Sequence, residues 1–448
     1  MLQSTALGIL KSGHNVFLTG SAGAGKSYTL RKYIEYLVEN KVKSECVAIT
    51  ASTGIAATHI GGCTIHSWSC IGIKDDISDK ALVDLLTYRK NKIEAIVSAK
   101  VLIIEEISML HRKQLNLVDR VMQFARNSVL PFGGLQVVVL GDFFQLPPVV
   151  KNTNNELDRD RFCFMSESWV SAKFKVCYLT EQYRNSSGEL NNILNAIRSC
   201  SIEDSHFETL NSYKPRDNGR EILHLHTHNA NIDVFNLNKL RGLIGDVYPF
   251  PSERYGNEKV LKYLQDSMLA PQNLELKIGA KVMFVKNNPD KGYANGTQGI
   301  VMKFIKDEVY EFLPVVKTLD GDEIIVEHEE WTFEENGKVL ASVKQLPLRL
   351  AWAITIHKSQ GMTLDEAIID LGNTFELAQG YVALSRLRNI EGLHLQNIKW
   401  DALKLNPLAI KADKRFQELS QISEKEFLSE GEKNIASSHK AFLKSMKK

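Results

Sequence analysis

The chain has 448 residues, and its 55 Lys and Arg nearly balance 53 Asp and Glu, which leaves a formal charge of +2. With 44% hydrophobic and 24% charged residues, the composition excludes a chain that is disordered throughout, and the charge excludes a wholesale polycation. No apolar run approaches the roughly 20 residues that span a bilayer, and the first residues lack the apolar core of a signal peptide.

The first third of the chain alternates short apolar segments with longer stretches of helical spacing. We expect helices around Leu30–Val38 and Leu115–Phe124, and a loop in the polar segment 151–161. Strands that alternate with helices predict a parallel, doubly wound sheet with ligands at the carboxyl ends of its strands. The expected strands are 15–19, 46–50, 101–104 and 135–140.

A second α/β region is expected from about Tyr178 onward. Its predicted strands are 221–227, 280–285, 366–371 and 393–398. Between 298 and 343, short strands separated by Gly, Pro and Asp turns predict a small antiparallel barrel inserted into this region. The tail from 410 is rich in Lys, Glu and Ser and is expected to be helical, either packed on the body or solvated.

A phosphate-binding loop is predicted at Gly20–Ser27, which fits G-x-x-x-x-G-K-[ST] between a strand and a helix. Small residues let backbone N–H groups close around phosphates at a helix N-terminus, where the helix dipole favours anions. Lys26 would reach the β- and γ-phosphates of ATP, and the Ser27 hydroxyl would bind Mg²⁺. The predicted nucleotide contacts in this segment are Gly23, Ala24, Gly25, Lys26, Ser27 and Tyr28.

Two carboxylates, Glu105 and Glu106, end the hydrophobic strand at 101–104. In a nucleotidase, one such carboxylate holds Mg²⁺ and the next orients and deprotonates the attacking water. Taken alone, two acids at a strand end are more often solvated. Because they follow a phosphate-binding loop, we interpret Glu105 as a Mg²⁺ ligand and Glu106 as the base.

Seven further segments follow the phosphate-binding loop in a fixed order. They are Thr50–Ala57, Gly62–Trp68, Glu105–Ser108, Gly141–Val149, Leu179–Arg184, His357–Asp365 and Gln379–Arg386. In this order they resemble motifs Ia to VI of superfamily 1B DNA helicases. The stretch Asp119–Val139, with Pro131-Phe-Gly-Gly-Leu-Gln136, resembles the signature segment of the petite-integration-frequency (PIF) helicase family, which RecD-type relatives generally lack.

The resemblance implies an α/β fold with two RecA-like, doubly wound parallel-sheet domains. Domain 1A would comprise 1–68 and 99–177, with a small wedge insert, 1B, at 69–98. Domain 2A would comprise 178–297 and 344–405, with the antiparallel β-barrel insert, 2B, at 298–343. A C-terminal helical tail would occupy 406–448.

The resemblance also assigns catalytic roles. Arg184 and Arg386 would act as arginine fingers on the γ-phosphate, although a lone arginine is more often part of a surface salt bridge. Gln145 would sense the γ-phosphate. Gln3 and Tyr183 would contact the adenine base. Gly361 would also contact the nucleotide.

Polar and aromatic side chains in the same motifs are expected to grip DNA without reading its sequence. The candidates are Thr53, Gly54, Thr64, His66, Trp68, Pro147, His228, Asn229, His357, Lys358 and Gln360. Trp68 is equally consistent with a packing role. His224 and His226 alternate with His228 along a predicted strand, and we interpret these two as strand packing rather than as a metal site.

The resemblance implies an ATP- and Mg²⁺-dependent helicase that moves 5′ to 3′ on single-stranded DNA. Forked duplexes, G-quadruplexes and RNA–DNA hybrids are the expected substrates, in repair, recombination, replication and telomere maintenance. We expect no membrane association, a monomer or a DNA-induced dimer, and a cytoplasmic, nucleoid-associated protein of a bacterium or phage host. Six scattered cysteines without a C-x-x-C pair agree with a reducing compartment.

Three alternatives stay open. A RecD-type helicase shares the chemistry but generally lacks the segment at Pro131–Gln136. A DNA-stimulated ATPase would translocate with little unwinding. A small-molecule kinase would leave the motifs from 357 to 386 unexplained.

The chain departs from the family pattern in two places. Glu105 stands where motif II usually has Asp, and the extra methylene is expected to change its contact with Mg²⁺. The chain also begins almost at Gln3, without the N-terminal extension of many relatives, as in a compact bacterial or phage-like form or a trimmed chain.

Overall fold

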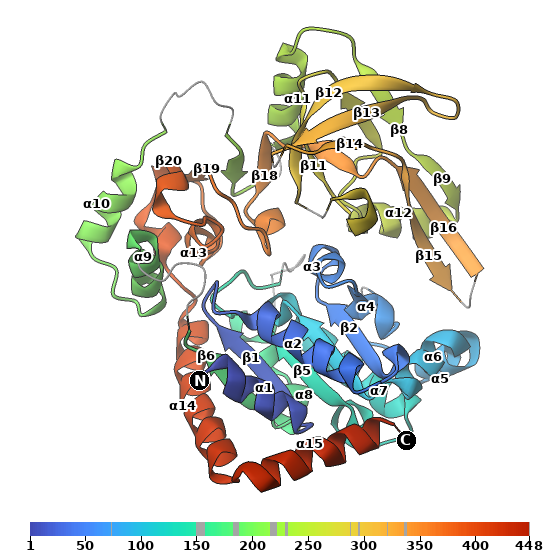
Figure 1. Ribbon diagram of the computed structural model, residues 1–448, viewed down its shortest axis with the longest axis vertical. Coiled ribbons are helices and arrows are strands. Elements are labelled where there is room, and N and C mark those ends of the chain that lie inside the picture. The colour runs from blue at the N-terminus through green and yellow to red at the C-terminus, as the bar shows by residue number, and fades with distance from the viewer. Residues whose placement is uncertain are drawn as a thin grey trace. The chain divides into compact units, whose positions relative to one another are not determined.

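The computed structural model describes residues 1–72, 74–148, 157–181, 188–215, 222–228, 232–286, 288–293, 296–319, 321–335 and 338–447. These residues form two compact units (Figure 1). Unit 1 comprises Met1–Glu203, Glu376–Ser385 and Asp401–Lys448. Unit 2 comprises Asp204–Phe375 and Arg386–Trp400.

Unit 1 contains a six-stranded sheet in the order β3-β2-β4-β5-β1-β6, and all of its strand pairs are parallel. The central strands β1 and β5 are buried along their whole length, as expected for a sheet covered on both faces. The four predicted strands are confirmed to within about a residue. The six are β1 (Val16–Gly20), β2 (Val47–Ala51), β3 (Cys63–Thr64), β4 (Val101–Glu105), β5 (Gln136–Leu140) and β6 (Lys175–Leu179).

Helices connect and flank these strands, and α5 and α6 lie within the stretch expected to form the wedge insert. The two compact units do not coincide with the predicted domains 1A and 2A. The expected boundary at 177/178 falls inside β6, and α9 and α13 belong to unit 1. The helices are α1 (Gln3–Lys11), α2 (Lys26–Glu39), α3 (Gly54–His59), α4 (Ile65–Trp68), α5 (Asp79–Tyr88), α6 (Lys90–Ser98), α7 (Arg112–Ala125), α8 (Glu167–Ser171), α9 (Glu189–Arg198) and α13 (Gln379–Leu384).

The C-terminal tail forms two helices, α14 (Pro407–Ser429) and α15 (Glu432–Met446). Helix α14 packs on β6 and α1, and α15 packs on α1 (Figure 1). Phe427 and Met446 are buried in the core beside β1 and α2. A Cβ atom added at Gly8 would lie 2.4 Å from the Phe427 ring, so α1 needs a glycine for this close approach. The tail is therefore packed rather than solvated.

Replacing Phe427 with alanine is expected to destabilise the protein by about 3 kcal/mol, because a buried aromatic ring leaves a cavity. The control is Leu428→Ala, one residue along the same helix, where the leucine side chain is exposed and should cost less than about 0.5 kcal/mol. Urea unfolding of both variants provides the measurement. Equal losses in the two variants would contradict the packing of α14 described above.

The segment Pro131–Gln136 braces the first sheet. The Phe132 N–H donates to Asp119 Oδ1 at 2.6 Å, which ties a turn with left-handed backbone at Phe132 to α7. Gln136 Nε2 donates to the Leu10 carbonyl at 2.9 Å, and Gln136 Oε1 accepts from the Tyr33 hydroxyl at 2.6 Å. This one buried amide thus links β5 to α1 and α2. These hydrogen bonds of Phe132 and Gln136 connect elements within unit 1.

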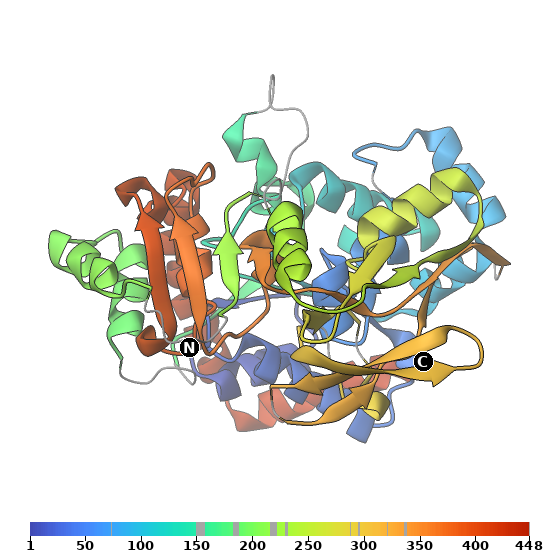
Figure 2. The ribbon, with the colours of Figure 1, turned by 90° about the horizontal axis from the view of Figure 1, so that it is seen from above.

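Unit 2 contains a four-stranded sheet in the order β18-β7-β19-β20, with parallel pairs throughout. Figure 2 shows these strands side by side, with yellow-green β7 beside orange β18. The elements are β7 (His224–His226), β18 (Ala353–Thr355), β19 (Ala367–Leu371) and β20 (Leu393–Ile398), with α10 (Asp204–Ser212) and α11 (Ile232–Gly242). The rings of His224 and His226 stack on each other and contact Phe235 of α11, which agrees with the packing interpretation.

The rest of unit 2 is antiparallel. Its sheets have the orders β14-β13-β12-β11-β17, β15-β16-β9 and β10-β8. The strands are β8 (Tyr248–Pro251), β9 (Glu253–Gly256), β10 (Asn273–Leu276), β11 (Lys281–Phe284), β12 (Gln298–Asp307), β13 (Glu311–Thr318), β14 (Glu323–Ile325), β15 (Glu329–Glu335), β16 (Lys338–Gln345) and β17 (Leu348–Leu350), with helix α12 (Glu258–Ser267).

The antiparallel insert is confirmed, but the placement of 280–285 in the parallel region was wrong. Strand β11 pairs antiparallel with β12 and β17. Its apolar run is equally typical of a buried strand in either kind of sheet, so hydrophobicity alone could not assign it. The antiparallel region therefore extends beyond the predicted bounds 298–343 on both sides.

Within the described ranges, no helix combines the length and hydropathy needed to cross a membrane. The same residues contain no group of three His, Cys, Asp or Glu side chains that could hold a metal ion. All six cysteines are free thiols.

Candidate nucleotide and DNA sites

The phosphate-binding loop joins β1 to α2. Gly23 and Gly25 adopt left-handed backbone with φ of 83° and 85°, and Gly25 is the N-cap of α2. Glycine fits these positions because it carries no Cβ. Lys26 Nζ donates to the carbonyls of Gly20 at 2.8 Å and Ser21 at 3.0 Å, so the ammonium lies over the loop. The arrangement suits an anion at a helix N-terminus.

Ser27 and Glu105, the two predicted Mg²⁺ ligands, are brought together. Ser27 Oγ donates to Glu105 Oε1 at 2.9 Å. Burial, and then the charge of Glu106, raise the pKa of Glu105 to about 7, whereas the Ser27 hydrogen bond and Lys26 act in the opposite direction. Hydroxyl and carboxylate oxygens are the donors that Mg²⁺ prefers, so this pair fits the ion.

Glu106 follows β4 in a left-handed conformation, with φ of 53° and ψ of 45°. This backbone costs a non-glycine residue about 1–3 kcal/mol, and such strain clusters at functional sites. The Ser52 hydroxyl donates to the Glu106 carbonyl at 2.6 Å and helps to hold the turn. The Ser52 contact therefore holds the backbone of the predicted base in this turn, directly after Glu105.

The loop after β5 carries Gln145 and Pro147, which are both buried. The Gln145 N–H donates to the Asp142 carbonyl at 2.9 Å. Gln145 Oε1 has no hydrogen-bond partner among the residues that the structure describes. A buried amide oxygen in that state is poised to accept from a ligand or an ordered water.

Gln3 lies at the phosphate-binding loop. Its Nε2 donates to the Ala24 carbonyl at 3.2 Å, and its backbone N–H donates to Glu181 Oε2 at 2.9 Å. Tyr28, in the first turn of α2, is exposed. The other predicted adenine contact, Tyr183, and the predicted finger Arg184 lie outside the described residues.

A buried ionic network that no sequence motif indicated lies within unit 1. Arg198 of α9 donates to Asp142 Oδ2 at 2.6 Å and to the hydroxyls of Tyr381 and Tyr178 at 2.7 Å each. Asp413 of α14 lies 3.5 Å from the same guanidinium. Although burial opposes the charge, Asp142 and its neighbours raise the pKa of Arg198 above its usual value. The network thus joins two motif segments, around Asp142 and Tyr381, to the C-terminal helix.

Apart from Pro147, the unit 1 residues predicted to bind DNA lie near the carboxyl ends of β2 and β3. Thr53 and Thr64 accept backbone hydrogen bonds at the starts of α3 and α4, and Gly54 begins α3. His66 Nε2 lies 3.2 Å from Gln114 Oε1. Burial lowers the pKa of His66, whereas the hydrogen bond with Gln114 acts in the opposite direction.

Trp68 is only 8% exposed. It lines a cavity of about 640 Å³ together with apolar side chains that include Ile34 and Val42. Stacking on a base needs an open ring face, so this burial favours the packing interpretation of Trp68.

In unit 2, three rings form a group that the sequence reasoning found only in part. Phe375 is 59% exposed, and its ring centroid lies 4.5 Å from that of His228 and 6.3 Å from that of His357. His228 and His357 are predicted DNA residues, and Phe375 carries no motif. An exposed aromatic group of this kind suits unpaired bases.

Other predicted residues of unit 2 surround the turn after β18. Both polar atoms of the buried Gln360 amide have no hydrogen-bond partner among the described residues. Gly361 has a φ of 80°, and the buried Arg386 accepts a backbone hydrogen bond from Leu364 at 2.9 Å. Asn229 lies outside the described residues.

Comparison with known proteins identifies similar chains. A family model described as PIF1-like helicase matches residues 4–201, and a model of the 2B domain of DNA helicase Pif1 matches residues 259–304. The second match begins ahead of the predicted insert at 298. The chain is 45% identical to ATP-dependent DNA helicase Pif1 of Psychrobacter over 99% of its own length and 75% of that protein. It is 34% identical to the Bdellovibrio bacteriovorus protein of the same name, covering 92% of it.

The chain spans 62% of the human ATP-dependent DNA helicase PIF1, with 36% identity. Among solved structures, Pif1 helicase from Candida albicans has a TM-score of 0.82 and 35% identity, over 92% of this chain and 98% of that one. Pif1 from Bacteroides in complex with ADP-AlF3 and ssDNA has a TM-score of 0.71 and 31% identity, over 93% and 96%. The similarity to these solved structures confirms the predicted α/β fold with two RecA-like domains.

Proposed function

The chain belongs to the Pif1 family of ATP-dependent DNA helicases, and we propose that it moves 5′ to 3′ on single-stranded DNA and separates forked duplexes. G-quadruplexes and RNA–DNA hybrids are the further substrates that we propose. The observation that carries the proposal is the 2.9 Å contact between Ser27 and Glu105, which joins the phosphate-binding loop to the motif II carboxylates.

At the nucleotide, each residue has a distinct role in this proposal. Lys26 and the backbone N–H groups of the loop bind the β- and γ-phosphates. Ser27 and Glu105 would hold Mg²⁺, which when bound supplies positive charge to the phosphates. Glu106 orients the attacking water and takes its proton, and Gln145 contacts the γ-phosphate. Arg184 and Arg386 would neutralise the charge that develops there.

The side chains proposed to contact DNA are mainly polar and aromatic. The Gln360 amide and the His228, Phe375 and His357 rings supply hydrogen bonds and stacking surface, and stacking contributes about 1–3 kcal/mol per base. Grips of this kind are consistent with a chain that carries a charge of only +2. Each phosphate held by a cation would strengthen binding and slow release. ATP turnover would alternate the grips of the two RecA-like domains.

We also propose that two molecules of this protein can act together on one forked duplex. A solved structure described as DNA unwinding at forked dsDNA by two coordinating Pif1 helicases has a TM-score of 0.68 and 31% identity to this chain. That relative supports a DNA-induced dimer as the alternative to a monomer.

The direction of movement can be tested by displacement of streptavidin from biotinylated single strands in the presence of ATP. We expect rapid displacement from a 3′-biotin and little from a 5′-biotin. Preference for the 5′-biotin would overturn the polarity. ATP hydrolysis that single-stranded DNA does not stimulate would instead favour the kinase alternative.

Glu105→Gln is expected to raise the Mg²⁺ concentration for half-maximal ATP hydrolysis by at least about tenfold, because a neutral amide is a much weaker ligand for this hard cation. Glu45→Gln, at an exposed position paired with Lys43, is the control and should leave the Mg²⁺ dependence unchanged. A magnesium titration of the steady-state rate makes the comparison. An unchanged half-saturation in Glu105→Gln would remove Glu105 from the proposed ion site.

A further inference from the structure

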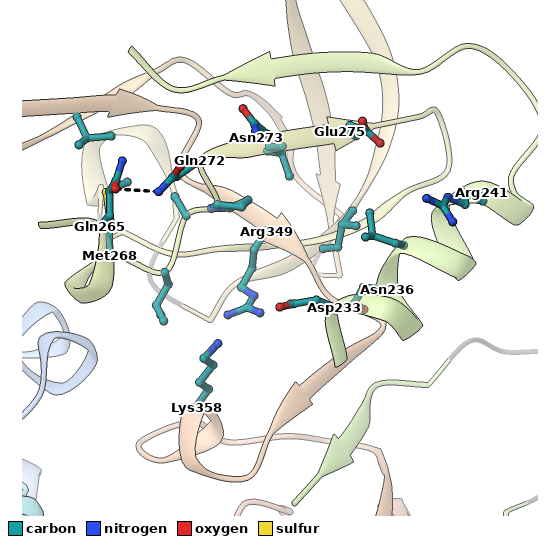
Figure 3. Close-up of a pocket in the computed structure, with 17 residues that line it drawn as sticks. Asp233, Asn236, Arg241, Gln265, Met268, Gln272, Asn273, Glu275, Arg349 and Lys358 are labelled. Atoms are coloured by element: carbon teal, nitrogen blue, oxygen red, sulfur yellow. Dashed lines mark hydrogen bonds between the residues drawn. The ribbon is translucent and has the colours of Figure 1, made fainter. Parts of the chain in front are cut away.

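A cavity of about 620 Å³ lies within unit 2, and three charged side chains converge on one end of it. Arg349 comes from β17, Lys358 from the turn His357–Ser359, and Asp233 from α11. Figure 3 shows the guanidinium of Arg349 and the ammonium of Lys358 pointing toward the same space, with the Asp233 carboxylate beside the guanidinium. None of the motifs assigns a role to Arg349.

Arg349 is buried without adequate polar contacts. Its side chain is 7% exposed, its Nε has no hydrogen-bond partner, and it makes no ion pair, among the residues that the structure describes. Burial lowers the pKa of Arg349, and the nearby charge of Asp233 raises it only in part. A cation desolvated in this way costs stability unless an anion completes the site.

Lys358 adds a second cation to the same space. Burial lowers the pKa of Lys358, and the positive charge of Arg349 lowers it further. Two like charges that face one cavity repel each other, and an anion placed between them would relieve the repulsion. A planar guanidinium beside an ammonium is also a suitable donor set for the oxygens of a phosphate.

The surroundings favour a phosphate that belongs to a nucleic acid strand. Lys358 shares its turn with His357, whose ring is part of the aromatic group around Phe375. A phosphate bound by Lys358 would therefore lie next to the aromatic group of His228, His357 and Phe375, which suits the stacking of unpaired bases. The cavity is also lined by Gln265 and Gln272, whose side-chain amides are hydrogen-bonded to each other at 2.7 Å (Figure 3).

We propose that Arg349 and Lys358 together bind one backbone phosphate of single-stranded DNA, with Asp233 as the counterion when no DNA is bound. This inference rests on the proposed function and adds to it a specific phosphate subsite with a residue outside the motifs. The site is charged, whereas the other DNA grips are polar or aromatic.

The test combines charge removal on the protein with charge removal on the DNA. Arg349→Gln is expected to weaken binding of a fluorescent single strand about tenfold and to reduce the slope of log affinity against log salt by about 0.7. Lys358→Gln should weaken binding to the same extent. The fold-loss in affinity of the double variant should be smaller than the product of the two single fold-losses, because both residues bind the same phosphate. Arg241→Gln, an exposed cation at the same cavity, should change affinity less than twofold.

A scan with single methylphosphonate linkages then locates the phosphate. Wild type should lose about tenfold in affinity at one linkage. Arg349→Gln should lose clearly less at that linkage, because only Lys358 still holds the phosphate, and the double variant should lose nothing more there. A penalty at that linkage that is equally large in Arg349→Gln and in wild type would overturn the assignment.

Arg349→Met separates a phosphate site from a structural role. Since the cation has no ion pair in the described part of the chain, we expect its thermal unfolding midpoint to equal or exceed that of wild type while DNA affinity falls. Arg349→Lys, which keeps the charge, should retain affinity within about threefold. A lower midpoint in Arg349→Met together with unchanged DNA affinity would make Arg349 a structural residue.

The outcomes also separate this inference from the proposed function. If wild type displaces streptavidin with 5′-to-3′ polarity and Arg349→Gln binds DNA as tightly as wild type, only the phosphate subsite is wrong. If wild type does not bind single-stranded DNA, both proposals fail.

Discussion

Replacing Lys26 with alanine should reduce ATP hydrolysis by at least about a hundredfold, the loss expected when a preorganised charge at the reacting group is removed. Lys26 Nζ already lies over the phosphate-binding loop through its contacts with the carbonyls of Gly20 and Ser21. The predicted DNA contacts involve other residues. Affinity for single-stranded DNA should therefore stay within about threefold of wild type.

The matched control for Lys26→Ala is Lys32→Ala, on the same helix. Lys32 is exposed and pairs with Glu35, so its loss should leave both hydrolysis and DNA binding unchanged. Steady-state hydrolysis and fluorescence anisotropy with a labelled strand measure the two quantities. Loss of DNA affinity together with hydrolysis in Lys26→Ala would mean that the loop is needed for folding rather than for phosphate binding.

Replacing Arg198 with alanine is expected to destabilise the protein by about 3–5 kcal/mol, because it leaves buried carboxylates without their cation. Asp142 and Asp413 both pair with this guanidinium, and the hydroxyls of Tyr178 and Tyr381 accept from it. Asp142 also accepts the backbone hydrogen bond of Gln145. The same substitution should therefore disturb the loop that carries the proposed γ-phosphate sensor.

Arg415→Ala on α14 is the control for this effect. Arg415 forms an exposed ion pair with Glu418, and its removal should cost less than about 1 kcal/mol. Denaturant unfolding of the two variants gives the comparison. A loss below about 1 kcal/mol in Arg198→Ala would show that the network is not the connection between α9, α13 and α14 that its geometry indicates.

Much of the nucleotide site was predictable because its determinants are local. The pattern Gly20–Ser27 specifies a turn and a helix start, and a run such as Val101–Ile104 specifies a buried strand. Parallel strands place their carboxyl ends at one edge of a sheet, so Glu105 was expected to approach Ser27, and the two side chains are hydrogen-bonded.

What escaped prediction depends on contacts between distant residues. Arg198 and Asp413 are 215 residues apart, and neither lies in a pattern that marks it as buried. Phe375 gains its position from the fold, which brings its ring near those of His228 and His357. Strand β11 was misassigned because its hydrophobic run carries no information about the direction of its partners.

The measurement that tests the account most directly is ATP-driven unwinding of matched duplexes that carry either a 5′ or a 3′ single-stranded tail. The account predicts strand separation of the 5′-tailed and forked substrates by wild type, none by Lys26→Ala, and little separation of the 3′-tailed duplex. Hydrolysis that single-stranded DNA stimulates, without separation of the 5′-tailed duplex, would contradict the helicase activity and leave a translocating ATPase.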